Sequence, residues 1–222
     1  VTFLTEAYIK QEQMEIMVGS AVLTTGMAAG LSKNEILNYA KELQEATSVG
    51  DEMILSSSAL LLTFKKIGGD EFKRAQKSMI DLTLAVNQGT ISEEKMKATT
   101  VMLGKALQDP VKGVTALRKA GVDLSLEQAN QIKNFMQLGK EAEAQRVILE
   151  EVEGQVGGLA EAWSKTAGAQ IYKMQGAFAD LKEELAKAFI PALLLVVKAL
   201  TALTKLFGSK HTWFFITAMT VA

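Results

Sequence analysis

The sequence contains no cysteine, one histidine and two prolines in 222 residues. Without cysteine the chain can form neither a disulfide framework nor a thiolate metal site, a composition that is compatible with a reducing compartment. The single histidine, His211, lies in a polar stretch and has no second imidazole with which to share a metal ion. The common zinc sites and the Ser-His-Asp arrangement therefore cannot all be assembled within this chain.

A strong charge of either sign is also missing. The net charge of −1 provides no basic field for nucleic acid, so we expect no sequence-specific nucleic-acid binding. Carboxylates occur as adjacent pairs, and because neighbouring residues on a helix point in different directions, we interpret these pairs as solvated faces. The glycines at 68–69 lack the lysine and hydroxyl residue of a phosphate-binding loop. We therefore expect no enzymatic activity, no cofactor and no metal. The carboxylate pairs are Glu93-Glu94, Glu150-Glu151 and Glu183-Glu184.

Apolar residues recur every three to four positions along most of the chain, and alternating apolar runs are absent, so the pattern predicts helices and no strands. We expect an all-α array of about eight to ten short helices with a C-terminal apolar helical hairpin. Local signals place several helix starts. These starts are Ser32 with Glu35, Asp70, Ser92, and Ser125 with Gln128.

The expected helices also have ends and inward faces. Met17 is expected to face the core from the first helix, and Val86 from the fourth. The helix that starts near residue 140 should close at Gly154, and one helical pattern should then run from residue 159 through residue 185.

We expect four parts along the chain. Residues 1–30 form an N-terminal helix that ends a longer helical region, and residues 31–156 form a helical domain. Residues 157–187 form a hinge and an amphipathic helix, and residues 188–222 form a truncated apolar segment of membrane-active type. The chain opens without a signal peptide and stops inside an apolar run, so we expect a segment of a longer polypeptide.

Residues 103–122 contain an unusually explicit helical corner. Asp109 is a good N-cap, and Pro110 falls at the first helical position, where its missing N–H costs nothing. Val114 and Leu117 share one face of the short helix that follows. Gly121 is placed to adopt the left-handed conformation that ends this helix.

The run GKALQDPVKGVTALRKAGV at residues 104–122 resembles the conserved box of tail tape measure proteins of long-tailed bacteriophages and prophages. The flanks are similar to the same family, and the resemblance covers most of residues 31–200. The matching motif positions are Gly104, Asp109, Pro110, Gly113, Leu117 and Gly121. Further collinear stretches are residues 43–54, 60–64, 72–75, 81–82, 144–149, 157–162 and 166–168.

The resemblance implies a structural protein that sets tail length during assembly and leaves ahead of the DNA to help open a route through the host inner membrane. Its implied partners are the tail tube protein, a tail assembly chaperone, the tail tip or baseplate proteins, that membrane, and copies of the chain itself, for example as a trimer. Its implied locations are the lumen of the virion tail, the host cytoplasm during assembly and the host inner membrane on ejection.

The last forty residues contain two apolar runs, which start at Ala188 and Trp213. A helix that spans a bilayer needs about 20 mostly apolar residues, and residues 188–207 reach that length. Asp180, Lys187, Lys198, Thr201 and Lys205 fall along one stripe at helical spacing. The expected membrane or partner contacts are Phe189, Ile190, Leu193, Leu194, Val197, Leu200, Leu203, Trp213 and Phe214.

Four interpretations of this segment stay open: a membrane helix in an oligomer, an amphipathic interfacial helix, a seam between copies of the chain, and a core helix pair of a soluble bundle. The main alternative to the phage function is a pore-forming helical toxin, in which a soluble bundle hides an apolar hairpin. The toxin interpretation predicts membrane insertion without any virion.

Overall fold

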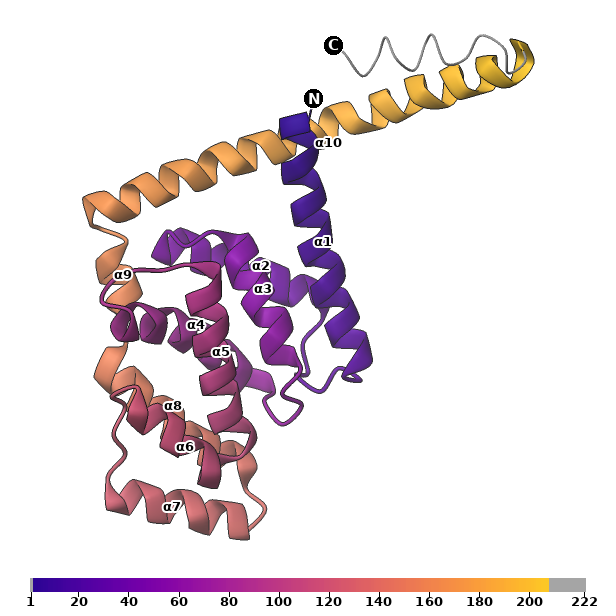
Figure 1. Cartoon of the computed structure of the whole chain (residues 1–222). Helices are drawn as coiled ribbons and strands as arrows, with labels where there is room; N and C mark the ends of the chain where they lie inside the picture. The colour runs from indigo at the N-terminus through magenta and orange to yellow at the C-terminus, as the bar shows by residue number, and fades with distance from the viewer. Residues whose placement is uncertain (1, 208–222) are drawn as a thin grey trace. The chain divides into compact units, whose positions relative to one another are not determined.

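The computed structural model describes residues 2–207, with the side chains of residues 2–7, 204, 206 and 207 left out. The described residues form helices and turns and contain no strand, which confirms the all-α prediction. The second apolar run, with Trp213 and Phe214, lies outside the described residues, as does His211. The helices, labelled in Figure 1, are α1 (Thr2–Thr24), α2 (Lys33–Thr47), α3 (Asp51–Leu62), α4 (Gly69–Val86), α5 (Glu93–Gln108), α6 (Pro110–Lys119), α7 (Leu126–Gln137), α8 (Glu141–Val156), α9 (Leu159–Trp163) and α10 (Ala167–Phe207).

The chain divides into two compact units, one made of residues 10–178 and the other of the described residues 2–9 and 179–207. In the larger unit α4 contacts α5, α8 and α9, and α5 also contacts α3 and α6 (Figure 1). The side chains between these helices form one continuous apolar core. Its largest fully buried members are Phe72, Ile36, Ile54, Leu55, Leu61, Ile67, Met79, Ile80, Leu82, Leu84, Met96 and Leu103.

Local capping signals placed three of the helix starts correctly, with Ser32, Ser92 and Ser125 as the N-caps of α2, α5 and α7. The Ser32 hydroxyl accepts from the Glu35 N–H at 3.3 Å, and the Glu35 carboxylate accepts from the Ser32 N–H at 2.8 Å. Ser125 and Gln128 form the same reciprocal pair before α7. These boxes hold because each one satisfies two N–H groups that a helix start leaves without partners.

The fourth helix start was predicted wrongly. Its N-cap is Gly68, and Asp70 lies in the first turn of α4 instead of capping it. The reason is a tertiary contact, because the N–H of Gly69 donates to the carbonyl of Ala29 at 2.8 Å. That bond satisfies the helix start from a distant loop, so a side-chain cap is not required.

Two predicted helix limits were also wrong. Helix α8 passes through Gly154 and ends at Val156, because the break falls at the next two glycines, where Gly157 is the C-cap and Gly158 adopts a φ of +80°. The pattern after residue 159 is two helices, since the turn at 164–166 separates α9 from α10.

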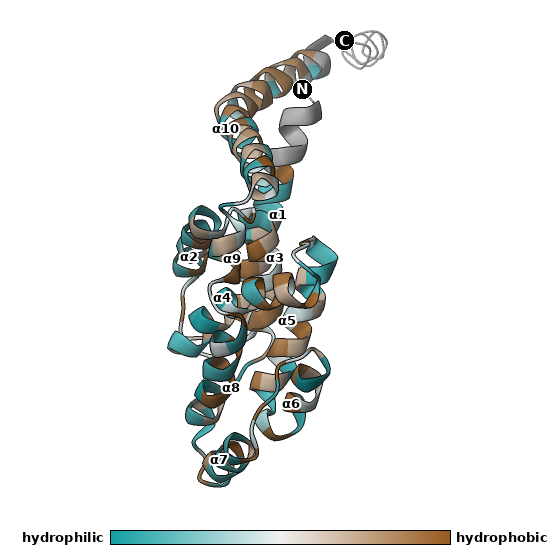
Figure 2. Ribbon diagram, turned by 90° about the vertical axis from the view of Figure 1, so that its left-hand side faces the viewer, coloured by the Kyte–Doolittle hydropathy of each residue, from teal (hydrophilic) through white to brown (hydrophobic). Residues whose placement is uncertain are grey.

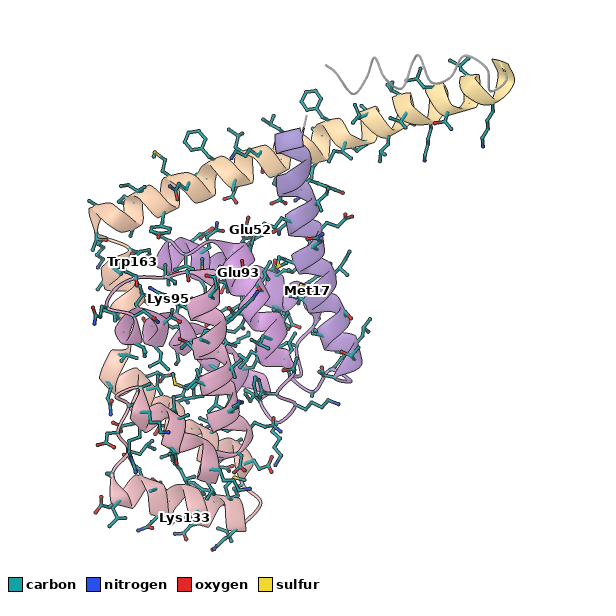
Figure 3. All side chains as sticks on the ribbon, in the orientation of Figure 1. Met17, Glu52, Glu93, Lys95, Lys133 and Trp163 are labelled. Carbon is teal, nitrogen blue, oxygen red and sulfur yellow. The ribbon has the colours of Figure 1, made fainter. Side chains whose placement is uncertain are left out.

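Two residues predicted to face the core are largely exposed. Met17, labelled in Figure 3, is 46% exposed, and Val86 at the end of α4 is 41% exposed. Each lies at the margin of its helix's apolar stripe, where its neighbours Val18 and Leu82 are fully buried instead. Helical periodicity locates a face, but it does not fix how wide the covered part of that face is.

Candidate functional surfaces

The Asp-Pro corner joins α5 to α6 as the sequence predicted. The side chain of Asp109 accepts from the N–H of Lys112 at 3.3 Å and caps α6, and Pro110 occupies the first helical position. Pro110 is buried, and so is Leu117, while Val114 packs on the core. Gly121 adopts a φ of +91°, and the N–H of Val122 donates to the carbonyl of Leu117 at 3.0 Å. This bond closes the helix in the manner of a left-handed C-terminal cap.

Two other glycines of the corner are needed for close packing. A Cβ at Gly113 would lie 2.3 Å from the Cα of Ala106 and 2.5 Å from the carbonyl oxygen of Lys105. A Cβ at Gly104 would lie 2.4 Å from the ring of Phe64. The backbone of α6 therefore rests directly on α5, and α5 rests directly on the aromatic ring. The corner is an architectural device in which each motif residue has a steric or backbone role.

Gln145 on α8 fixes the corner to the rest of the bundle, and the sequence pattern gave no signal of this role. Its buried amide donates to the carbonyls of Leu107 at 3.0 Å and Lys66 at 2.8 Å. Gln108 in turn accepts from the N–H of Lys66 at 3.2 Å. The partners are separated from Gln145 by 38 and 79 positions, so no local rule could have identified them.

A shallow, open hollow of about 480 Å³ lies at the corner. Lys105, Lys112 and Lys119 line it together with Gln108, Asp109 and Thr115. No group of three histidine, aspartate or glutamate residues able to hold a metal ion occurs in the part of the chain that the structure describes. The hollow thus offers three basic side chains around a shallow depression.

A polar stripe along α4 holds α8 and α9 in place, and sequence reasoning did not find it. Arg74 makes a two-point contact with Glu153, with N–O distances of 2.9 and 2.8 Å. The carboxylate of Asp81 accepts from the N–H groups of Ala160 at 2.7 Å and Gly158 at 3.3 Å. The remaining pairs of the stripe are Glu71 with Arg146 and Lys77 with Glu161.

Asp81 is the most deeply buried member of this stripe, at 2% exposed against 6% for Glu71. Burial raises the pKa of its carboxyl above the ordinary value, although the N–H groups of Ala160 and Gly158 and the ammonium of Lys77 act in the opposite direction. Burial outweighs these contacts because Asp81 is only 2% exposed. Asp81 therefore ties the turn before α9 to α4 with a carboxylate that is costly to keep charged.

The second candidate surface is helix α10, which is long, apolar and largely uncovered. Its apolar stretch, residues 167–203, is long and apolar enough to cross a membrane by length and composition, and only 6% of its most apolar window is buried. Figure 2 shows hydrophobic colour along the helix. Of the predicted contacts, Phe189, Leu193, Leu194, Val197 and Leu203 are exposed and Ile190 and Leu200 are partly buried.

Four charged side chains of α10 fall on one side of the helix. Asp180, Lys187, Lys198 and Lys205 are separated by steps of seven or eleven residues, which bring them to nearly the same side of a helix. All four are exposed. The carboxylate of Glu183 pairs with Lys187, and the hydroxyl of Thr201 donates to the carbonyl of Val197 at 2.7 Å. Polar groups near the apolar run are thus partly satisfied by the helix itself.

The two surfaces differ in whether their apolar side chains are covered. At the corner, apolar groups are covered and glycines allow close backbone approach, whereas α10 leaves its large apolar side chains open. Comparisons of the chain with protein-family models, with curated proteins and with solved structures give no match.

Proposed function

We propose that this chain is a segment of a tail tape measure protein of a long-tailed bacteriophage or prophage, and that α10 is its membrane-entering helix. The observation that carries the proposal is the exposure of α10, where Phe189 is 64%, Leu195 68% and Leu194 52% exposed. Exposed apolar surface on this scale marks a site of contact with a partner or a membrane. Helices α2 to α8, which bury a core of their own, form the body that precedes it.

The motif residues support the phage assignment through their architectural roles. All six positions of the box contribute to one corner, as a cap, a helix start, a helix end, a buried leucine or a close backbone contact. A protein that acts by shape requires such residues, whereas an enzyme requires converging polar groups. The proposed partners are those that the resemblance implies: the tail tube, the assembly chaperone, the tail tip and the host inner membrane.

The dimensions of α10 suit a membrane helix with charged margins. Lys187 and Lys205 are 18 positions apart, which corresponds to about 27 Å at a rise of 1.5 Å per residue. The hydrocarbon core of a bilayer is about 30 Å thick, so the two ammonium groups would reach opposite interfaces. Lys198 lies between them and would cost roughly 2.5–3.5 kcal/mol at the bilayer centre. Its long stem allows the charge to extend toward the nearer interface.

A vesicle flotation experiment tests the membrane function. The 222-residue chain is mixed with liposomes of bacterial lipid composition, and the fraction that floats is compared with that of the double variant Leu194→Asp, Val197→Asp. We expect the double variant to lose binding, since two charges would enter the apolar face. The matched control is Leu126→Asp, Leu138→Asp, which changes two leucines of helix α7 and its C-cap that are 75% and 69% exposed. Equal binding by all three proteins would refute the membrane function.

Tail length tests the assembly function. In the phage or prophage that encodes the chain, an in-frame deletion elsewhere in the gene should shorten the tail by about 1.5 Å per residue removed, the rise of an extended helix. Tails of unchanged length would refute the tape measure assignment and leave the membrane function standing.

A pore-forming helical toxin is the alternative, and the same exposed helix favours it. A toxin should release a trapped dye from vesicles with the purified chain alone, without any virion component. Dye release together with an unchanged tail length would replace the phage proposal with the toxin.

A further inference from the structure

Helix α9 begins without a cap from its own sequence. Its N-cap is Gly158, which adopts a φ of +80° and has no side chain that could accept a hydrogen bond. The carboxylate of Asp81 on α4 accepts instead from the N–H groups of Ala160 at 2.7 Å and of Gly158 at 3.3 Å. A helix start leaves such N–H groups without partners, and an N-cap side chain normally satisfies one of them. The beginning of α9 therefore depends on a residue that is 77 to 79 positions away.

Two ion pairs flank this contact on the same face of α4. Arg74, Lys77 and Asp81 are spaced by three and four positions, which brings them to one side of the helix. Arg74 pairs with Glu153 on α8, and Lys77 pairs with Glu161 on α9 at 2.9 Å. The side chains of Lys77 and Glu161 are 48% and 49% exposed, and an exposed pair of this kind contributes little to stability. Asp81, which is buried, thus makes the stronger of these two polar contacts between α4 and α9.

Helix α9 is also held by few apolar contacts. Ala160, at 2% exposed, is its buried side chain, and Trp163 packs partly on the core. Leu159 is 37% exposed, and Glu161 and Ala162 are exposed as well. Hydrophobic stabilisation grows with the apolar area removed from water, so a buried alanine contributes less than the leucines and isoleucines of the core. The polar contact at its start is therefore a large share of what holds α9 on α4.

Helix α9 is joined to its two neighbours in the chain in different ways. Toward α8 the connection is the glycine pair 157–158, and glycine adopts the positive φ of Gly158 without strain. Toward α10 the connection is reinforced by an aromatic contact. The ring centroids of Trp163, labelled in Figure 3, and Tyr172 on α10 lie 5.6 Å apart at an interplanar angle of 54°. A movement of α9 away from α4 would therefore bend the chain at the glycines and carry the beginning of α10 along.

We propose that α9 detaches from α4 while the core stays folded, with the Asp81 contact as the latch and residues 157–158 as the hinge. Opening hydrates a buried carboxylate and uncovers one alanine and part of an indole ring, which is a small set of contacts compared with that of the core. The latch gives the larger unit control over when the beginning of α10 is free. It goes beyond the membrane and assembly functions proposed above, and its test requires neither lipid nor virion.

Thiol labelling tests the latch on the 222-residue chain, because that chain contains no cysteine of its own. Ala160→Cys places a single thiol on α9, and Ala59→Cys places one on α3, where the alanine is 5% exposed. A maleimide reagent reaches either thiol only when the structure around it opens. We expect position 160 to react at least about tenfold faster than position 59, since it needs the opening of α9 and not global unfolding.

Changes to the latch and to the core should have separate effects. Asp81→Asn removes the charge and one of the two acceptor oxygens, so it should accelerate labelling at position 160 by about tenfold or more. Asp70→Asn is the matched control, because it makes the same change at an exposed carboxylate of α4 and should leave that rate unchanged. Ile148→Val changes a fully buried residue of α8. It should accelerate labelling at position 59 and not at position 160, since the core is intact when α9 is open.

The opposite results would overturn the proposal. Equal labelling at the two positions, or equal acceleration of both by Ile148→Val, would show that α9 opens only when the whole unit unfolds. An unchanged rate at position 160 with Asp81→Asn would show that this carboxylate is not the latch. If Asp81→Asn does not fold, Gly158→Ala takes its place, because nothing lies within 4 Å of the added Cβ but the positive φ strains an alanine. It should accelerate labelling at position 160 several-fold, and an unchanged rate would overturn the proposal equally.

Discussion

The contact between Gly113 and α5 gives a prediction whose magnitude can be worked out. Alanine at position 113 would place its Cβ 2.3 Å from the Cα of Ala106 and 2.5 Å from the carbonyl oxygen of Lys105. Both neighbours are backbone, so the helices must separate, and overpacking of this kind costs about 1–3 kcal/mol. Alanine also gains about 0.5–1 kcal/mol over glycine within a helix. We expect Gly113→Ala to lower the free energy of unfolding by about 1 kcal/mol.

Gly154→Ala is the matched control, because Gly154 also lies inside a helix and nothing stands within 4 Å of the Cβ position. It should raise the free energy of unfolding by about 0.5–1 kcal/mol. The gain in helix propensity is common to both variants, so their difference isolates the steric contact at about 1–3 kcal/mol. Urea unfolding followed by circular dichroism at 222 nm measures both values. If Gly113→Ala is as stable as Gly154→Ala, the close packing of the corner is refuted.

Two further predictions concern polar groups. Ser125→Ala removes the hydroxyl that accepts from the Gln128 N–H at 3.2 Å and should lower the unfolding free energy by about 1 kcal/mol; an unchanged free energy of unfolding would contradict the capping role. Because burial raises the pKa of Asp81 in the folded chain, its contribution to stability is fully present below the unfolded pKa and is lost as the pH rises through the higher folded pKa. The unfolding free energy of the wild type relative to that of Asp81→Asn should therefore fall as the pH rises through this window in urea titrations, and a difference that rises with pH would show that the two N–H contacts outweigh burial.

The parts of the fold that were predictable depend on neighbours in the sequence. The capping boxes at Ser32 and Ser125 and the Asp109-Pro110 start involve residues within one helical turn, so the residue types alone determine them. The left-handed end at Gly121 has the same local origin. The errors arose where a distant residue decides the outcome, as when the carbonyl of Ala29 satisfies Gly69 and makes a cap by Asp70 unnecessary.

The same distinction between local and distant determinants applies to the candidate surfaces. The composition of α10 predicted a long apolar helix, because a continuous apolar run does not depend on what packs against it. Whether Leu181 and Leu194 are covered is a property of the whole structure, and so is the role of Asp81, whose partners are 77 and 79 positions away. Sequence patterns predicted a long apolar helix, and only the structure revealed which of its apolar side chains are open.

Helix α7 packs on α6 and α8 at the edge of the larger unit, and Ile132 is its buried side chain (Figure 3 shows Lys133 next to it pointing away). A peripheral helix with one fully buried side chain can detach at a lower free energy than the α3–α5 core requires. Its 12 residues would lengthen from about 18 Å as a helix to about 40 Å when extended. Under a pulling force, unfolding of α7 would thus lengthen the chain while the α3–α5 core keeps its shape.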